Sequence, residues 1–472
     1  MFSMNSPLKN VESLFLSQKE KCSSLSKSTH KERKQKLKSL LNNFMETEDQ
    51  AIEALSSDLK KSPTESVVSE VLGIKTEASF AIKNLKSWMK VRRVSSPATV
   101  FFTSGWVRPE PKGSVLILSP WNYPIMLALN PLIAAIAAGN TAIIKPSEFA
   151  PASGEFLKRL VKKTFSKDEV AVVLGDQGAA KELLSHPFNH VFFTGSPATG
   201  KLVMSAAAKH LSSVTLELGG KSPVVVDDSA NIKEAAWKIA FYKFANAGQT
   251  CTAPDYILCH ESKLSSLLAG LKENFKNFFS GDGERPSSDY CQIVNEAHFE
   301  RVLGYLEDAK RLGATVEFGG KAEKDSLFIS PTILSGVSLD SQIMEEEIFG
   351  PLMPIITYNK LDEALDFIKE REKPLALYLF SYSRAAQKRM TEETSSGALL
   401  FNDCLIHHTN PNLPFGGINN SGLGSYHGKY GFDSFSHEKA ILKSSSWSPF
   451  KLMLPPYTKK KRSLVNMIKK LS

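Results

Sequence analysis

Residues 115–144 read VLILSPWNYPIMLALNPLIAAIAAGNTAII, and this stretch decides the fold class of the chain. It begins with a short apolar run that is typical of a buried strand, and residues 141–144 form a second run of this kind. Between them the sequence stays apolar for long enough to predict a helix that ends near Ala138. A strand, a helix and a second strand in this order form a unit with parallel strands. We therefore expect a parallel sheet around residues 115–144.

The same alternation of strands and helices continues toward the C-terminus. A helix is expected after Pro151, and further strands are expected at residues 170–174, 190–193 and 214–218. This pattern predicts an α/β fold, with helices on both faces of a mostly parallel sheet. Such sheets bind ligands at the carboxyl ends of their strands.

A second α/β unit begins after Gly219-Gly220 and extends to about residue 420. Its first strand is expected at residues 224–226, followed by a helix over about 230–245. Two other segments lie before the first unit. Residues 30–95 carry a helical pattern of apolar positions, and residues 98–107 are rich in β-forming residues.

Composition places the chain among globular proteins of two or three domains, with 472 residues of which 42% are hydrophobic. The five cysteines are odd in number and lack CxxC spacing, which predicts a reducing, cytoplasmic setting without disulfides or a zinc site. The polar cluster at residues 403–408 fits no defined metal-ligand spacing. The N-terminus does not read as a secretory signal, and the longest apolar run, 125–138, is too short to span a bilayer.

The net charge of +9 comes from an excess of basic residues at the two ends of the chain. Residues 1–40 hold nine Lys or Arg against three Glu, and residues 459–470 hold six Lys or Arg. We therefore expect no nucleic-acid channel through the body of the protein. In the C-terminal tail, Leu464, Met467, Ile468 and Leu471 recur at helical spacing. The tail is either a short helix on an anionic lipid surface or a solvated, frayed terminus.

Cys251 is the candidate nucleophile, because it lies in NAGQTCT (246–252), a turn of small and polar residues. Glu217 lies between two leucines at the end of an expected strand, where a carboxylate is a candidate general base. Taken alone, each residue has a plainer interpretation. A single cysteine is more often a small buried hydrophobe, and a lone glutamate is often an ion-pair partner.

A glycine-containing loop, FFTGSPATGK (192–201), follows an expected strand and opens a helix, which suits the binding of a phosphate group. The loop is not a P-loop, because Leu202 stands where Ser or Thr must hold magnesium. The later Gly220-Lys221-Ser222 does not end a P-loop either, because Thr215 stands where the motif requires its first glycine. The GxGxxG motif of the ordinary Rossmann fingerprint is also absent from the sequence. A P-loop nucleotide hydrolase is therefore a poorly supported alternative.

Seven motifs in order resemble those of aldehyde dehydrogenases. They are WNYP (121–124), KPSE (145–148), FTGSPATG (193–200), LELGGKSP (216–223), GQTCTAPDY (248–256), EEIFGP (346–351) and LPFGG (413–417). REKPLALY (371–378) and NSGLGSYHGK (420–429) are most similar to the class 3 branch, which includes fatty and aromatic aldehyde dehydrogenases. The resemblance covers roughly residues 10–450 and leaves out the basic tail.

The resemblance implies oxidation of an aldehyde to a carboxylic acid. Cys251 would attack the carbonyl, and the Asn122 side chain and the Cys251 main-chain N–H would hold the oxyanion. After hydride transfer, Glu217 would activate water to hydrolyse the thioester. A CoA-acylating enzyme and a catalytically silent protein of the same fold remain alternatives.

The resemblance also implies NAD as the cofactor, with NADP as a second one. Lys145 and Glu148 would lie near the adenosine ribose, where Glu148 favours the 2′-hydroxyl of NAD over a phosphate. The other implied cofactor-binding residues are Trp121, Gly195, Ser196, Gly200, Glu347 and Phe349. Tyr123, Phe401 and Phe415 would line the substrate tunnel, although core packing explains Phe401 equally well.

The family architecture has a Rossmann-type cofactor domain, an α/β catalytic domain and a small β bridging element. Carried over to this chain, they would be formed by residues 1–82 with 108–219, by 220–420, and by 83–107 with 421–450, followed by a basic tail, 451–472. The class 3 likeness implies a homodimer that pairs through the bridging element.

Overall fold

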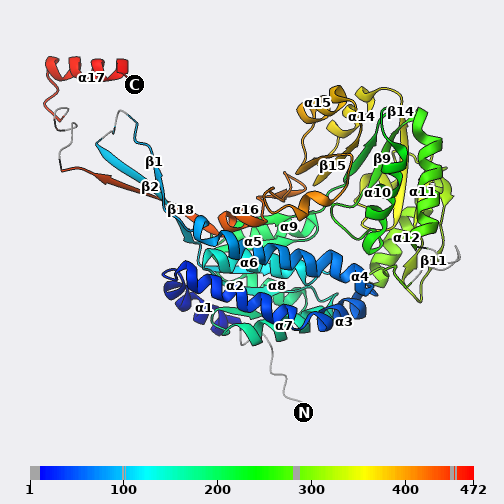
Figure 1. Cartoon of the computed structure of the whole chain (residues 1–472), viewed down its shortest axis with the longest axis horizontal. Coiled ribbons are helices and arrows are strands. Elements are labelled where there is room, and N and C mark those ends of the chain that lie inside the picture. The colour runs from blue at the N-terminus through cyan, green and yellow to red at the C-terminus, as the bar shows by residue number, and fades with distance from the viewer. Residues whose placement is uncertain are drawn as a thin grey trace, which may run out of the picture.

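The computed structural model describes residues 11–97, 100, 102–279, 288–446, 451 and 454–471. Two α/β units lie side by side, and a narrow three-stranded arm projects from one of them and leads to the C-terminal helix (Figure 1). The α/β fold class expected from the sequence is confirmed.

The first unit is built on a six-stranded sheet with the strand order β17-β7-β6-β3-β4-β5. All neighbouring strands are parallel except β17, which runs antiparallel to β7. The strands are β3 (Ser114–Leu118), β4 (Thr141–Lys145), β5 (Val170–Val172), β6 (His190–Thr194), β7 (Ser213–Glu217) and β17 (Gly422–Leu423). The five strands expected here are present, with ends that differ by at most two residues.

Helices cover this sheet. They are α1 (Val11–Leu25), α2 (His30–Met45), α3 (Glu48–Leu59), α4 (Pro63–Ser66), a π-helical turn (Val67–Val71), α5 (Leu72–Trp88), α6 (Met126–Ala138), α7 (Pro151–Thr164), α8 (Gln177–Leu184), α9 (Pro197–Ala208) and α16 (Gly428–Ser434). Every residue of α6 is buried, which explains why its sequence is apolar except at Asn130. The helix ends at Gly139, whose positive φ of 94° suits a residue without a side chain.

The second unit has a seven-stranded sheet with the order β10-β13-β14-β9-β8-β15-β16, parallel except for β10. Its strands are β8 (Pro223–Val226), β9 (Tyr256–His260), β10 (Thr315–Phe318), β13 (Thr332–Ser335), β14 (Leu352–Tyr358), β15 (Ala376–Phe380) and β16 (Ala398–Phe401). Its α-helices are α10 (Ile232–Phe244), α11 (Leu264–Phe279), α12 (Glu296–Arg311), α13 (Gln342–Glu345), α14 (Leu361–Lys369) and α15 (Arg384–Glu393). A small hairpin, β11 (Ala322–Glu323) with β12 (Phe328–Ile329), and short 3₁₀ turns at Ala245–Gly248, Glu261–Lys263 and Ile406–Thr409 complete it.

The arm is an antiparallel sheet of β1 (Arg92–Val94), β2 (Thr103–Pro111) and β18 (Ser436–Ser444). The helical pattern expected up to residue 95 in fact ends at Trp88, and β1 follows it. Within the β-rich stretch 98–107, the strand begins at Thr103, while Ala98 and Phe101 lie outside the described residues. The chain finishes in α17 (Lys459–Leu471).

Residues 422–423 and 428–434 form β17 and α16, which contact the first unit before the chain enters β18 of the arm. Gly422 pairs with Glu217 in the six-stranded sheet, and α16 packs against α5 and α6. Among the helices that the structure describes, none is long and apolar enough to cross a membrane.

Candidate active site

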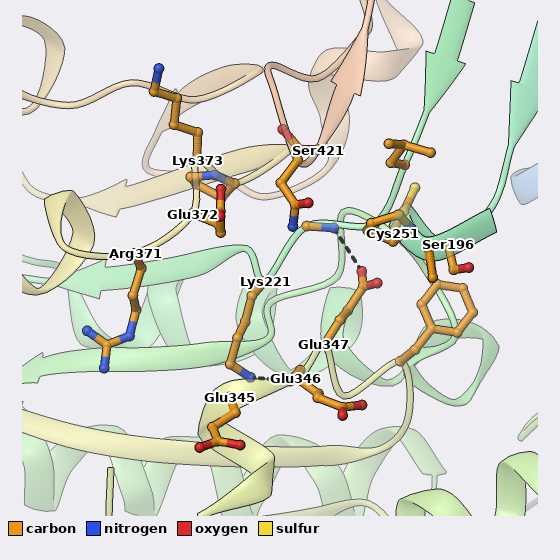
Figure 2. A pocket seen from close by; sticks show the side chains of 18 of the residues that line it. Ser196, Lys221, Cys251, Glu345, Glu346, Glu347, Arg371, Glu372, Lys373 and Ser421 are labelled. Atoms are coloured by element: carbon orange, nitrogen blue, oxygen red, sulfur yellow. Dashed lines mark hydrogen bonds between the residues drawn. The ribbon is translucent and has the colours of Figure 1, made fainter. Parts of the chain in front are cut away.

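A cavity of about 1050 Å³ lies between the two units, where β6 and β7 of the first sheet end and β8 and β9 of the second sheet begin. Cys251, Glu217 and Asn122 all line it. Five of the eight expected cofactor-binding residues also line it: Trp121, Gly195, Ser196, Glu347 and Phe349. In Figure 2, Cys251 and Ser196 lie at one side of the cavity, Glu347 lies in the middle, and Arg371, Glu372 and Lys373 lie at the opposite side.

The loop before Cys251 has an unusual backbone. Asn246, Ala247 and Gly248 have consecutive positive φ values of 53°, 52° and 73°. Positive φ is unfavourable for a residue with a side chain such as Ala247, so the surroundings must hold this turn in place. Gly248 cannot be replaced without movement, because a Cβ there would lie 2.3 Å from the carbonyl oxygen of Gly350.

Hydrogen bonds from distant segments fix this turn. Glu65, in α4, accepts the Asn246 main-chain N–H at 2.7 Å. The Gln249 side chain donates to the carbonyls of Asn246 and Gln292, both at 3.0 Å, and accepts the Val294 N–H at 3.0 Å. The turn that carries Cys251 is thus held by two distant parts of the chain, Glu65 and the segment 292–294.

The Cys251 thiol is half-buried, and its environment favours the protonated form. Burial raises the pKa of the thiol to about 12, and the nearby Glu347 and Glu217 carboxylates add to the increase. A thiol with this pKa needs a proton acceptor or a positive charge nearby before it can attack. Cys259, Cys291 and Cys404 are buried, and Cys22 lies within 3.2 Å of the Thr141 hydroxyl, outside this cavity.

Glu217 ends β7, so its carboxyl group lies at the edge of the sheet that faces the cavity. Only 3% of the residue is exposed, and neither carboxyl oxygen has a hydrogen-bond partner within the described part of the chain. Burial raises the pKa of Glu217 well above its ordinary value. A carboxyl group whose pKa is raised in this way holds a proton more strongly once it has accepted one, which suits general-base catalysis.

Asn122 lies in the loop between β3 and α6, and 3% of it is exposed. Its side-chain amide donates to the Gln249 carbonyl at 3.0 Å. The amide has a second N–H, which is the group available to an oxyanion. The Asn122 main-chain carbonyl accepts hydrogen bonds from Lys61 Nζ at 3.3 Å and from Asn246 Nδ2 at 2.9 Å.

The carboxylate of Glu347 lies in the cavity against the backbone of Gly219 and Gly220. Its Oε1 accepts the Gly220 N–H at 3.0 Å, as the dashed line in Figure 2 shows. A Cβ at Gly219 would lie 1.9 Å from Glu347 Oε2, so the carboxylate needs a glycine at this position. Burial and the neighbouring Asp255 raise the pKa of Glu347 to about 8.

Two cations that the sequence analysis did not single out hold the segment around Glu347. Lys221 Nζ donates to Asp255 Oδ1 at 2.6 Å and to the carbonyls of Ile343 and Glu346. Arg301, in α12, donates to the carbonyls of Glu347, Ile348 and Phe349 at 3.3, 3.0 and 3.4 Å. Lys221 belongs to the LELGGKSP motif, so the sequence contains a signal for it. Nothing in the sequence relates Arg301 to residues 347–349.

Three expected cofactor residues do not line the cavity. Lys145, the last residue of β4, and Glu148, three residues after it, form an ion pair with Nζ and Oε2 at 2.7 Å. Gly200 lies inside α9 against β7, where a Cβ would meet Leu218 at 2.6 Å. Ser196 is the N-cap of α9 and accepts the Thr199 N–H at 3.3 Å. Gly200 therefore has a packing role, and its role toward a cofactor stays a prediction.

The three expected tunnel residues also lie away from the cavity lining. Tyr123 is buried, and its hydroxyl lies 2.6 Å from the Thr250 hydroxyl. Phe415 is buried and stacks on His407 with ring centroids 5.5 Å apart, whereas Phe401 is 39% exposed at the end of β16. Their assignment to a substrate tunnel stays a prediction.

The chain as a whole is similar to known proteins. A sequence model described as the aldehyde dehydrogenase family matches residues 5–441. The chain is 47% identical over 425 residues to 4,4'-diaponeurosporen-aldehyde dehydrogenase of Staphylococcus aureus, covering 90% of this chain and 92% of that protein. It is 43% identical over 423 residues to aldehyde dehydrogenase family 3 member B2 of Mus musculus, covering 89% of this chain and 87% of that protein.

Solved structures are similar as well. The structure of Staphylococcus aureus AldH in a substrate-bound state has a TM-score of 0.92 at 44% identity, covering 97% of this chain and 99% of that chain. The NAD⁺ complex of an aldehyde dehydrogenase from Bacillus cereus has a TM-score of 0.84 at 25% identity, covering 93% of this chain and 89% of that chain.

Proposed function

Because the chain belongs to the aldehyde dehydrogenase family and oxidises aldehydes, we propose that Cys251, Asn122 and Glu217 carry out this reaction in the cavity between the two units. The observation that supports the proposal most strongly is that one cavity is lined by all three side chains together with Glu347 and Phe349. A nucleophile, a neutral amide donor and a buried base are the groups that acyl chemistry requires.

The proposed reaction begins when the Cys251 thiolate attacks the aldehyde carbonyl and forms a C–S bond. The carbonyl oxygen takes the negative charge, which the free Asn122 N–H and the Cys251 main-chain N–H stabilise. A nicotinamide cofactor, when bound, would supply the two-electron acceptor for the hydride that the substrate carbon loses, and its positive charge would favour the thiolate form of Cys251. Glu217 then takes a proton from water, the water attacks the thioester, and the C–S bond breaks to release the carboxylic acid.

The residues around the cavity fit such a cofactor. The Gly195-Ser196 turn stands at the N-terminus of α9, a favourable place for a diphosphate. The glycine at position 219 gives Glu347 room to reach the cavity, where its carboxylate could accept from a ribose hydroxyl. The rings of Trp121 and Phe349 meet at 5.4 Å beside this space. These five residues would hold the cofactor.

We propose that NAD is preferred and NADP is accepted. Glu148 would repel a 2′-phosphate, and the Lys145 ammonium at 2.7 Å partly offsets that charge. Glu148→Gln should lower the KM for NADP and leave the KM for NAD nearly unchanged. Equal KM changes for both cofactors would contradict this assignment of Glu148.

The proposed substrates are medium-chain or long-chain aliphatic aldehydes and aromatic aldehydes. Similarity to a 4,4'-diaponeurosporen-aldehyde dehydrogenase and to family 3 members supports apolar substrates. The decisive assay follows NADH production from a chain-length series of aldehydes, with NAD and then with NADP, in the absence of CoA. We expect acid formation without CoA, and Cys251→Ser should remove it. Full activity in Cys251→Ser would refute the proposed mechanism.

We propose that the protein acts as a cytoplasmic homodimer that pairs through the arm. The strand order β1-β2-β18 leaves β18 at an edge, where its backbone can pair with another chain. Leu442, on β18, is 65% exposed. Leu442→Lys should shift the sedimentation coefficient from that of a dimer to that of a monomer. A monomeric wild-type protein would contradict the proposal.

We also propose that the C-terminal helix α17 contacts anionic lipid. Val465 and Met467 are 44% and 55% exposed, and Arg462 and Lys469 lie in the same helix. In Figure 1, α17 stands at the tip of the arm, away from both units. Deletion of residues 457–472 should abolish binding to phosphatidylserine vesicles. Unchanged binding by the truncated protein would contradict the lipid role.

A further inference from the structure

The N-terminal segment Lys61–Glu70 lies far from Asn122 in sequence and directly behind it in space. The Lys61 ammonium and the Glu70 carboxylate form an ion pair at 3.0 Å, with 0% and 1% of the two side chains exposed. Two fully buried charges cost desolvation energy, so such a pair contributes little to stability compared with an apolar pair of the same size. Its contacts with the neighbouring loop indicate another role.

Both members of the pair bind the main chain around Asn122. Lys61 Nζ donates to the Asn122 carbonyl at 3.3 Å and lies 4.2 Å from the centre of the Tyr123 ring. Glu70 Oε2 accepts the N–H groups of Ile125 and Met126, each at 3.0 Å, at the start of α6. The loop is therefore anchored on both sides of the Asn122 side chain.

Glu70 belongs to the π-helical turn Val67–Val71. Such turns are rare and occur frequently at functional sites. Here the turn carries the carboxylate that accepts the Ile125 and Met126 N–H groups, while its other oxygen accepts from Lys61.

We propose that Lys61 and Glu70 are positioning residues for the oxyanion donor: they hold the Asn122 main chain so that its free side-chain N–H is aimed at the developing oxyanion. The inference rests on the proposed role of Asn122. Neither residue lines the cavity, so both act only through the loop at 122–126. Because oxyanion stabilisation occurs in the transition state, loss of the pair lowers kcat and leaves cofactor affinity unchanged.

The test is a double-mutant cycle between the buried pair and Asn122. The variant Lys61→Met/Glu70→Met replaces both charged side chains with apolar ones that still fill the space, so no lone charge is left in the interior. We expect kcat to fall about 10- to 100-fold in the wild-type background. In the Asn122→Ala background, we expect the same pair of substitutions to change kcat less than about twofold, because the donor that they position is already gone.

A matched control removes another ion pair of the same unit. Lys36 and Glu169 pair at 2.7 Å between α2 and the residue before β5, away from the cavity. Lys36→Met/Glu169→Met should leave kcat and the KM for cofactor unchanged. If the apolar double variant fails to fold, Lys61→Arg takes its place in the cycle, since it keeps the charge and alters the contact with the Asn122 carbonyl.

The outcomes separate this inference from the proposed function. If Asn122→Ala alone leaves kcat unchanged, the oxyanion role of Asn122 fails. If Asn122→Ala lowers kcat but the Lys61/Glu70 substitutions cause equal losses in both backgrounds, or no loss at all, the positioning role is overturned. A loss confined to the background that contains Asn122 supports it.

Discussion

The side-chain amide of Asn122 donates to the main-chain carbonyl of Gln249, two residues before Cys251, across 3.0 Å. This hydrogen bond joins the loop after β3 in the first unit to the turn before β9 in the second. Asn246 Nδ2 adds to the connection, because it donates both to the Asn122 carbonyl and to the Gln249 carbonyl. The proposed oxyanion donor and the proposed nucleophile are therefore positioned by one shared set of contacts.

Asn122→Asp should be more damaging than Asn122→Ala. An aspartate cannot donate to the Gln249 carbonyl or to an oxyanion, and its negative charge opposes the charge that develops there. We expect Asn122→Ala to lower kcat by about 10²- to 10³-fold and Asn122→Asp to lower it further. Steady-state NADH production measures both, and an Asp variant as active as the Ala variant would argue against a charged intermediate beside residue 122.

Glu217→Gln should separate acylation from hydrolysis. Without the base, the thioester forms but is hydrolysed about 10²- to 10⁴-fold more slowly. Stopped-flow mixing should then show a burst of NADH close to one per active site, followed by a slow steady state. Since burial raises the pKa of Glu217, the wild-type hydrolysis rate should rise with pH as the carboxyl group loses its proton. A variant with neither burst nor turnover would place Glu217 in the first step instead.

Glu347→Gln should make Cys251 more reactive in the enzyme without cofactor. The Glu347 carboxylate is the largest cause, after burial, of the raised pKa of the Cys251 thiol, so its removal lowers that pKa and increases the thiolate fraction. Iodoacetamide labelling of Cys251, quantified by peptide mass spectrometry, should be faster in the variant at alkaline pH. Labelling of the buried Cys259 in the same sample is the internal control and should not change.

The same variant should change how stability depends on pH. Glu347 has a pKa of about 8 in the folded protein, against an ordinary value of 4.5. Between these values the folded state retains a proton that the unfolded chain releases, so the free energy of unfolding falls as pH rises. Glutamine does not titrate, so the Tm of Glu347→Gln relative to wild type should increase from about pH 5 to about pH 9. A difference in Tm that stays constant with pH would show that Glu347 ionises normally.

Gly219→Ala should impair cofactor use without unfolding the protein. The new Cβ would lie 1.9 Å from Glu347 Oε2, and the end of a flexible side chain can move away at little cost. Displacement of the carboxylate should lower kcat/KM for the cofactor about 10- to 100-fold. Gly304→Ala is the control, because in the described part of the chain a Cβ at this position in α12 meets no atom within 4 Å beyond its chain neighbours and the nearby backbone of its own helix. It should retain activity and gain about 0.5–1 kcal/mol of stability.

The sequence predicted those features that depend on local pattern. Apolar runs such as 115–118 and 141–144, separated by a helix, were sufficient for the parallel strands β3 and β4, because a buried strand needs apolar residues on both faces. The ends of elements were less predictable. The helical pattern continued past Trp88, yet β1 forms there because Arg92–Val94 pair with β2, a contact that no local signal reveals.

The residues that carry the proposed chemistry were identifiable from the sequence, because Cys251, Glu217 and Asn122 lie in recognisable motifs. The residues that hold them were not. Lys61, Glu65 and Arg301 act on backbone atoms of segments that are remote in sequence. Hydrogen bonds to main-chain carbonyls and N–H groups do not depend on which side chain the bonded residue carries, so they leave no pattern in the sequence of their partners.

The sequence by itself thus determined the α/β architecture and the family, and it supplied the proposed reacting groups, since these depend on hydrophobic periodicity and on side-chain chemistry at fixed spacings. Only the tertiary structure decided how Cys251 is presented. It brings together a turn with three positive φ values, a buried carboxyl group that has no hydrogen-bond partner among the described residues, and an ion pair behind Asn122. The physical reason is that pKa shifts, backbone strain and donor orientation arise from burial and from contacts between segments distant in sequence.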